Sequence, residues 1–203
     1  MKALYVTDRA AVGGERLGEI LSALRGAPGV AVVLRESPPG DRERLARARD
    51  ARARLGAAVP LLVHRRFDVA VAAGADGVHL PSDGLPVERV RAHAPRGFRV
   101  GVSTHAAAEA GRAIAGGADL VVIGPVFDTP SKRRYGPPLG PAALADLPPK
   151  ASHGAEVYAI GGVDETTLDA LAPYADRISG VAAIRMFQES ADPRALVARL
   201  AAR

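Results

Sequence analysis

Short apolar runs alternate along the chain with polar segments and with stretches whose apolar residues recur at helical spacing. Leu120 to Ile123 is an unbroken run of mostly β-branched residues, typical of a strand that is covered on both faces in a parallel sheet. Between Glu15 and Arg25 the apolar residues fall at i, i+3, i+4 and i+7, which predicts an amphipathic helix. Similar patterns predict strands that begin near residues 2, 30, 61, 77, 98, 119, 157 and 178, each followed by helical sequence.

Eight strand-helix units indicate a (βα)8 barrel, formed as a single domain by residues 1–203. The alternative is an open, doubly wound sheet. The segment from Gly74 to Leu80 resembles that from Gly117 to Ile123, and Tyr174-Ala175-Asp176 is a looser third copy, so a helix-to-strand unit recurs. Asp164 is placed to cap a helix that continues to about Pro173.

Composition adds limits to this picture. Hydrophobic residues make up 48% of the 203 residues and charged residues 24%, as in an ordinary globular protein. The chain has no cysteine, which excludes disulfides and cysteine-ligated metals. No apolar run is long enough to cross a bilayer and the first residues predict a strand, so we expect a cytoplasmic protein without a membrane partner.

The formal net charge of +5 suits an anionic partner. It does not indicate nucleic acid, because the arginines of the helix predicted from Asp41 are spread around its surface and are typical of a solvated face; they stand at positions 42, 44, 47, 49, 52 and 54.

Polar side chains follow the predicted strands, where a barrel would collect them at one mouth. Arg35 and Arg185 follow two of these strands, and Gly161-Gly162 follows a third, where backbone can approach an anion closely. Lys132 lies in the polar segment after Ile123, in a chain with lysine only at positions 2, 132 and 150. These residues predict a small anionic ligand, most simply a phosphate ester, although a solvated charge run and a plain glycine turn are the simpler explanations of each motif alone.

Three side chains at strand ends are candidate acid-base groups: His105, His64 and Glu36. His105 is preferred because it adjoins Ser103. The alternative is that both histidines are hydrogen-bonded loop residues and that Glu36 is an ion-pair partner. His79 alternates with apolar residues in a predicted strand and is expected to be structural.

Several motifs together resemble the thiamine phosphate synthase and TenI family. They occur in the family's order over nearly the whole chain: Tyr5-Val-Thr-Asp, Leu34-Arg-Glu, Gly77-Val-His-Leu, Gly101-Val-Ser-Thr-His, Gly124-Pro-Val-Phe-Asp-Thr-Pro-Ser-Lys and Ile160-Gly-Gly-Val. The resemblance implies a (βα)8 barrel that acts on phosphorylated thiazole or pyrimidine precursors of thiamine. It also implies that Thr129, Ser131 and Lys132 hold pyrophosphate, that Gly161, Gly162 and the last strand hold the thiazole phosphate, and that Arg35 and Ser103 lie near the rings.

The sequence also departs from the synthases it resembles. These hold magnesium with two aspartates, for which this chain has Arg65 and Gly84, with Asp83 one position before the second. A cation in the place of a metal ligand repels the metal. Ser37 replaces a lysine, and Pro81-Ser82 replaces Gly-Gln, as in TenI-type thiazole tautomerases. The histidine of those tautomerases is Pro125 here, and Arg185 replaces a serine.

From these departures we expect a TenI-like thiazole tautomerase that uses no metal and no cofactor. One alternative is a thiamine phosphate synthase that joins hydroxymethylpyrimidine diphosphate to thiazole phosphate. Another is a non-catalytic paralogue that binds such a ligand. A homodimer is compatible with the family resemblance, but the sequence shows no interface.

Overall fold

The computed structural model describes residues 1–36, 40–130, 132–133 and 136–203. Eight parallel strands are hydrogen-bonded in chain order, β1 to β8, into a closed barrel, which confirms the predicted (βα)8 fold and excludes the open sheet. The strands are β1 Lys2–Val6, β2 Val30–Leu34, β3 Leu61–His64, β4 Gly77–Leu80, β5 Arg99–Thr104, β6 Leu120–Ile123, β7 Glu156–Ile160 and β8 Gly180–Ala183.

Helices follow the strands, and some of the helical segments in the described ranges are of the 3₁₀ type. The α-helices are α1 Arg9–Ala23, α2 Asp41–Leu55, α3 Phe67–Ala72, α4 Val87–Arg91, α5 Ala107–Ala115, α6 Arg185–Gln188 and α7 Pro193–Ala201. The 3₁₀ segments are η2 Pro141–Asp146, η3 Lys150–Ser152 and η4 Leu168–Tyr174. Among the described residues, no helix is both long and apolar enough to cross a membrane.

The chain contacts separate into two compact units. Unit 1 comprises residues 1–79, 96–99 and 184–203, and unit 2 comprises residues 80–95 and 100–183. The single domain expected over residues 1–203 stays a prediction.

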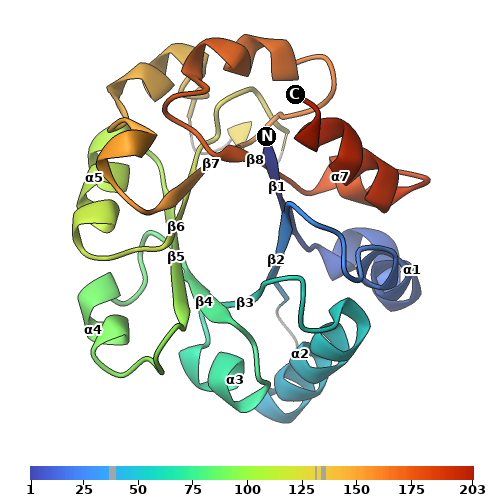
Figure 1. Cartoon of the computed structure of the whole chain (residues 1–203). Helices are drawn as coiled ribbons and strands as arrows, with labels where there is room; N and C mark the ends of the chain where they lie inside the picture. The colour runs from blue at the N-terminus through green and yellow to red at the C-terminus, as the bar shows by residue number, and fades with distance from the viewer. Residues whose placement is uncertain (37–39, 131, 134–135) are drawn as a thin grey trace. The chain divides into compact units, whose positions relative to one another are not determined.

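Unit 1 is built on β1, β2 and β3, with α1 and α2 packed against their outer side (Figure 1). The register pairs Tyr5 with Val32 and Leu34 with Val63. Tyr5 is fully buried and its ring stacks on Phe187 of α6, with 4.9 Å between the centroids. Burial raises the pKa of Tyr5 to about 12, so this phenol stays neutral at physiological pH.

His79 is a buried residue of β4, as the sequence analysis expected. It is 4% exposed, and the register places it opposite His64 of β3, with 6.0 Å between the ring centroids. Burial, and to a smaller extent the neighbouring His64, lowers the pKa of His79 to about 3. His79 is therefore neutral in the folded protein.

The same kind of side-chain hydrogen bond occurs just before β4, β6 and β8. It joins each of these strands to the strand that precedes it. Asp76 precedes β4 and accepts from the Leu61 amide (2.7 Å), and Asp119 precedes β6 and accepts from the Val100 amide (2.7 Å). Arginines from the preceding helices hold both carboxylates: Arg52 binds Asp76 at 2.9 Å and Arg91 binds Asp119. The repeated Ala-Asp step of the sequence therefore satisfies an amide at the beginning of the preceding strand, that of Leu61 or Val100.

The third copy of this repeat was assigned to the wrong residue. Ser179, not Asp176, precedes β8, and its hydroxyl accepts from the Val157 amide (3.1 Å). The Ser179 amide in turn donates to the Val157 carbonyl, as the Asp76 amide does to Leu61 and the Asp119 amide to Val100. The Asp176 side chain is 66% exposed and pairs with Arg177 at 3.2 Å.

The helix predicted after Asp164 is also different. The 3₁₀ segment η4 begins at Leu168, and its cap position is Thr167, which makes no side-chain cap bond. The Asp164 carboxylate instead accepts from the amides of Thr166 (2.9 Å) and Thr167 (3.1 Å), which closes a turn before η4.

We expect Asp119→Ala to destabilise the protein by about 1–3 kcal/mol, because it leaves the buried Val100 amide without its side-chain acceptor. The measurement is urea-induced unfolding at pH 7. Asp176→Ala is the matched control and should change the free energy of unfolding by less than about 0.5 kcal/mol, as for an exposed ion pair. Equal effects of the two substitutions would contradict the role given to Asp119.

We expect His79 to make the folded state less stable as the pH falls below 6.5. The unfolded chain binds a proton at His79 near pH 6.5, whereas the folded protein binds it only near pH 3. The stabilisation is therefore complete above pH 6.5, and about 2 kcal/mol of it is lost between pH 7 and pH 5. Urea unfolding across this range should show a weaker pH dependence in His79→Gln than in the wild type, whereas the exposed control His93→Gln should keep the wild-type dependence.

Candidate functional site

The candidate residues at the strand ends belong to two groups, one in each unit. Unit 1 contains Arg35, Glu36, His64 and Arg185, and unit 2 contains Ser103, His105, Thr129, Lys132, Gly161 and Gly162. Ser131 lies outside the described residues. The roles given to these residues stay predictions, and the two groups are described separately.

Arg35 directly follows β2 and is held by two residues at the end of β1. Its amide donates to the buried Thr7 hydroxyl (2.9 Å), and its guanidinium donates to the Asp8 carboxylate (3.0 Å). The Asp8 carbonyl accepts in turn from the side chain of Gln188 in α6 (2.9 Å). The Arg35 side chain remains 39% exposed, so part of the guanidinium can reach a ligand. Sequence analysis did not predict the Arg35–Asp8 pair, because nothing in the spacing of the two residues indicates it.

Glu36 faces α2 and forms an ion pair, but not with its neighbour Arg35. Its carboxylate accepts from Arg47 at 3.0 Å, and the side chain is only 3% exposed. Its backbone carbonyl accepts from Arg44 at 3.0 Å. The geometry therefore agrees with the ion-pair alternative, and it adds Arg47 to the residues that shape this region.

A small hollow lies between the ends of β2 and β3 and the first turns of α2. It has about 220 Å³ of atom-free space, part of it open to solvent, and is lined by Leu34, Glu36, Arg44, Arg47, Val63 and His64. One carboxylate oxygen of Glu36 is buried there without a hydrogen-bond partner among the described residues. A buried carboxylate oxygen of this kind is suited to accept from a water molecule or a ligand donor.

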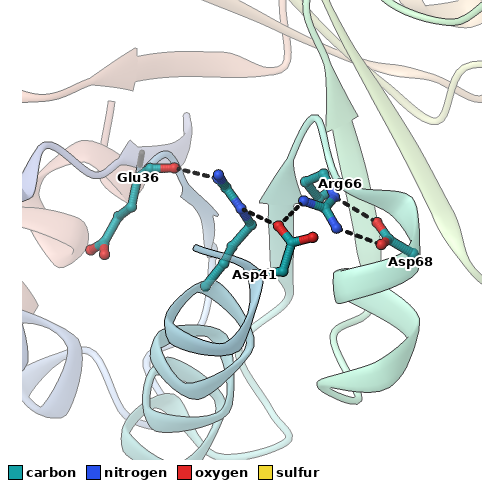
Figure 2. A network of polar contacts seen from close by, with 5 residues as sticks. Glu36, Asp41, Arg66 and Asp68 are labelled. Carbon is teal, nitrogen blue, oxygen red and sulfur yellow. Dashed lines mark hydrogen bonds and ion pairs between the residues drawn. The ribbon is translucent and has the colours of Figure 1, made fainter. Parts of the chain in front are cut away.

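Figure 2 shows the polar network that joins this hollow to the loop after β3. Arg66 donates two bonds to Asp68 (2.8 and 2.6 Å) and also binds Asp41 at the start of α2. The hydrogen bonds from Arg66 lower the pKa of Asp68 to about 2 and also lower that of Asp41. Asp41 lies 3.9 Å from Arg44, which binds Glu36. The network fixes the loop after β3 against the beginnings of α2 and α3.

The residue before Arg66 has an unusual backbone conformation. Arg65 has φ of 66°, and it is the one non-glycine residue with positive φ in the part of the chain that the structure describes. The Arg66 amide donates to the His64 carbonyl at 2.8 Å, which closes a three-residue γ-turn around Arg65. Positive φ costs an arginine about 1–3 kcal/mol relative to ordinary backbone. The Arg65 amide donates to the His79 carbonyl at 2.9 Å, which helps to hold the turn.

In unit 2, the loop after β6 packs directly on Gly161-Gly162. The amides of Val126 and Phe127 donate to the carbonyls of Ile160 (2.8 Å) and Gly161 (2.9 Å), so the loop continues the pairing of β6 with β7. Both glycines have positive φ, and a Cβ on Gly161 would lie 2.6 Å from the Cα of Pro125. The close approach of this loop is sufficient reason for glycine at these positions.

His105 directly follows β5, and its ring is turned toward the end of β6. Its Nδ1 lies 2.7 Å from the Gly124 carbonyl, and its amide donates to Glu109 at 2.8 Å. Because a carbonyl only accepts, Nδ1 carries the hydrogen and donates it. This contact agrees with the alternative that His105 is a hydrogen-bonded loop residue. Ser103 lies inside β5, whose end is two residues later than the predicted strand.

The polar loop of residues 128–133 carries the candidates Thr129 and Lys132. The Lys132 amide donates to the Thr129 carbonyl at 2.9 Å, which folds the two residues into one turn. Arg133 binds Asp128 at 2.5 Å, so these two charges neutralise each other. Both Thr129 and Lys132 are partly exposed. In unit 1, Arg185 is exposed at the first position of α6.

The residues at the positions implied for magnesium do not fit a metal ion. Arg65 carries a positive charge, and the Gly84 amide donates to the Pro81 carbonyl (3.0 Å) in a tight turn. A Cβ on Gly84 would lie 2.9 Å from the Pro81 ring and 3.0 Å from its carbonyl, so this turn has no room for an aspartate. Among the described residues, no three His, Cys, Asp or Glu side chains are grouped to hold a metal.

Comparison with known proteins gives the family. The sequence profile described as thiamine monophosphate synthase matches residues 3–187. The chain is 38% identical to the thiamine-phosphate synthase of Methanoculleus marisnigri, covering 89% of this chain and 86% of that protein. It is 36% identical to the thiamine-phosphate synthase of Methanoregula boonei, covering 89% and 84%.

A solved structure agrees with this similarity. The thiamine phosphate pyrophosphorylase from Pyrococcus furiosus is 25% identical to this chain, with a TM-score of 0.78, and the match covers 99% of this chain and 94% of that one.

The preference for a TenI-like tautomerase was wrong, because the relatives that match most of the chain are named synthases. The preference came from a few substituted positions, whereas the comparison uses nearly all of the sequence. The family resemblance itself is confirmed. By this similarity along its length, the chain belongs to the thiamine monophosphate synthase family.

Proposed function

We propose that this protein is a transferase that makes thiamine phosphate from hydroxymethylpyrimidine diphosphate and a thiazole phosphate. The observation that carries the proposal is the identity of 36–38% to named thiamine-phosphate synthases over 89% of the chain. In this reaction the bond between the pyrimidine methylene and the diphosphate oxygen breaks, and the oxygen keeps the electron pair. The thiazole nitrogen then bonds to the methylene, and inorganic pyrophosphate leaves. The small-molecule partners and a cytoplasmic location belong to the same proposal.

The chemistry of the described residues supports a transferase. Loss of a diphosphate needs positive charge and hydrogen-bond donors near the departing oxygens, and it needs no side chain that removes a proton from carbon. Pro125 therefore does not obstruct this reaction, and neither does the engagement of His105 with the Gly124 carbonyl. Arg35 and Arg65 are cationic side chains of unit 1, and Lys132 is a cationic side chain of unit 2; each unit is considered separately. Because the magnesium positions do not fit, no step is assigned to a metal.

Binding of the two substrates can be proposed from the same groups. Thr129 and Lys132 form one turn and would bind diphosphate oxygens through a hydroxyl and an ammonium. Gly161 and Gly162 would present backbone to the thiazole phosphate, as the family resemblance implies. Arg35 is held in place by Asp8 and would contact a ring or phosphate with its exposed part.

The direct test supplies both precursors to the purified protein and follows thiamine phosphate and pyrophosphate together. We expect equal amounts of the two products. Purified protein that binds thiazole phosphate but makes no thiamine phosphate, with or without magnesium, would contradict the proposed reaction and would favour the non-catalytic paralogue.

We expect Lys132→Ala to lower kcat/KM by about 10²–10³-fold, because the reaction would lose a cation that stabilises the departing diphosphate. The measurement is steady-state synthesis with the diphosphate substrate varied. Lys150→Ala is the matched control: it removes a lysine from η3 and should keep kcat/KM within about twofold of wild type. Wild-type kcat/KM in Lys132→Ala would show that Lys132 does not stabilise the diphosphate.

We expect His105→Asn to retain most of the synthase activity, within about threefold of the wild-type kcat. The asparagine amide can still donate to the Gly124 carbonyl, whereas it cannot act as an acid or base near neutral pH. The same synthesis assay, run from pH 6 to pH 9, provides the measurement. A loss of more than 10²-fold with a changed pH profile would show instead that the imidazole takes part in catalysis.

A further inference from the structure

The γ-turn at the end of β3 holds an arginine in a conformation that glycine would adopt without strain. Arg65 has φ of 66°, and the backbone bonds from Arg66 to His64 and from Arg65 to His79 fix that conformation. Strained residues persist where surrounding contacts over-determine them, and they cluster at functional sites. A function for the Arg65 side chain accounts for an arginine at a position that glycine would occupy without strain.

Ion pairs of the neighbouring residue Arg66 hold the turn, and so they also fix the backbone position of Arg65. Arg66 is bound by Asp68 through two bonds and by Asp41 from α2, as Figure 2 shows. These contacts raise the pKa of Arg66, keep it fully charged and anchor the loop after β3. The Arg65 side chain is exposed at the strand end. An exposed guanidinium at this position is accessible to a ligand at the strand end.

The charge at position 65 determines which ligand this turn can bind. A carboxylate there would attract a divalent cation, whereas a guanidinium repels a cation and binds phosphate oxygens through two parallel hydrogen bonds. The turn at Gly84 likewise has no room for an aspartate. Both positions implied for magnesium therefore disfavour the metal, and one of them favours an anion.

We propose that Arg65 binds the diphosphate group of the substrate directly, at the end of β3, and replaces the charge that a magnesium ion would supply. This inference rests on the proposed function for the identity of its ligand, an organic diphosphate whose product is inorganic pyrophosphate. It assigns Arg65 a role as a binding residue for diphosphate oxygens. It also implies that this protein binds pyrophosphate when divalent cations have been removed.

The experiment measures binding of inorganic pyrophosphate by titration calorimetry in buffer that contains EDTA. It compares the wild type with Arg65→Gly, which accepts positive φ and removes the whole side chain with its charge, and with Arg65→Lys, which keeps a point charge. We expect at least tenfold weaker binding in Arg65→Gly, an intermediate loss in Arg65→Lys, and a thermal midpoint of Arg65→Gly equal to or above that of wild type. Arg89→Ala removes an exposed arginine of α4 and should bind as wild type does.

Three results would overturn the inference: no binding of pyrophosphate, binding only when magnesium is added, or equal affinity in wild type and Arg65→Gly. The synthesis assay separates this inference from the proposed function. If the wild type makes thiamine phosphate and Arg65→Gly binds pyrophosphate as tightly as the wild type does, the role of Arg65 is rejected and the transferase is retained. Weaker binding in Arg65→Gly without synthesis by the wild type would retain the diphosphate site and reject the transferase.

Discussion

The pairing of parallel strands in a fixed register is the interaction on which every other feature of this protein depends. Register decides which residue is the last of each strand, and therefore which side chains stand at the strand ends. Asp76, Asp119 and Ser179 fix it locally, because each binds an amide in the first two residues of the preceding strand. A shift by one residue would turn His64 to the opposite face of β3. The side-chain hydrogen bonds at the beginnings of the strands therefore help to position the candidate residues at the strand ends.

The sequence predicted the fold well because the barrel is encoded in repeated local patterns. Apolar runs such as Leu120 to Ile123 mark buried parallel strands, and eight of them with helical connections leave few other folds. One error came from a contact between distant residues, and another from a local turn. Ser179 replaces aspartate in the third repeat and can be recognised only through its bond to Val157. The helix expected after Asp164 begins later, because that carboxylate closes a turn with its own neighbours.

The site was predicted less completely for the same reason. Strand-end positions could be identified from the sequence, but the partners of Arg35 and Glu36 could not. Arg44, Arg47 and Arg52 belong to a helix whose arginines were interpreted as a solvated face. In the structure they bind the Glu36 carbonyl, the Glu36 carboxylate and the Asp76 carboxylate. Arginine combines a long apolar stem with five donors, so it can serve a surface and a buried acceptor together, and spacing alone does not distinguish these uses.

The wrong preference for a tautomerase has a chemical explanation. It treated Arg65 and Gly84 as evidence against diphosphate chemistry, because those positions cannot hold magnesium. Departure of a diphosphate requires neutralisation of negative charge, and guanidinium groups are among the cations that can neutralise it. A proton transfer, by contrast, requires a specific acid-base group, and Pro125 cannot provide one. The substituted positions therefore indicate which groups could supply positive charge. The similarity along the whole chain indicates the class of reaction.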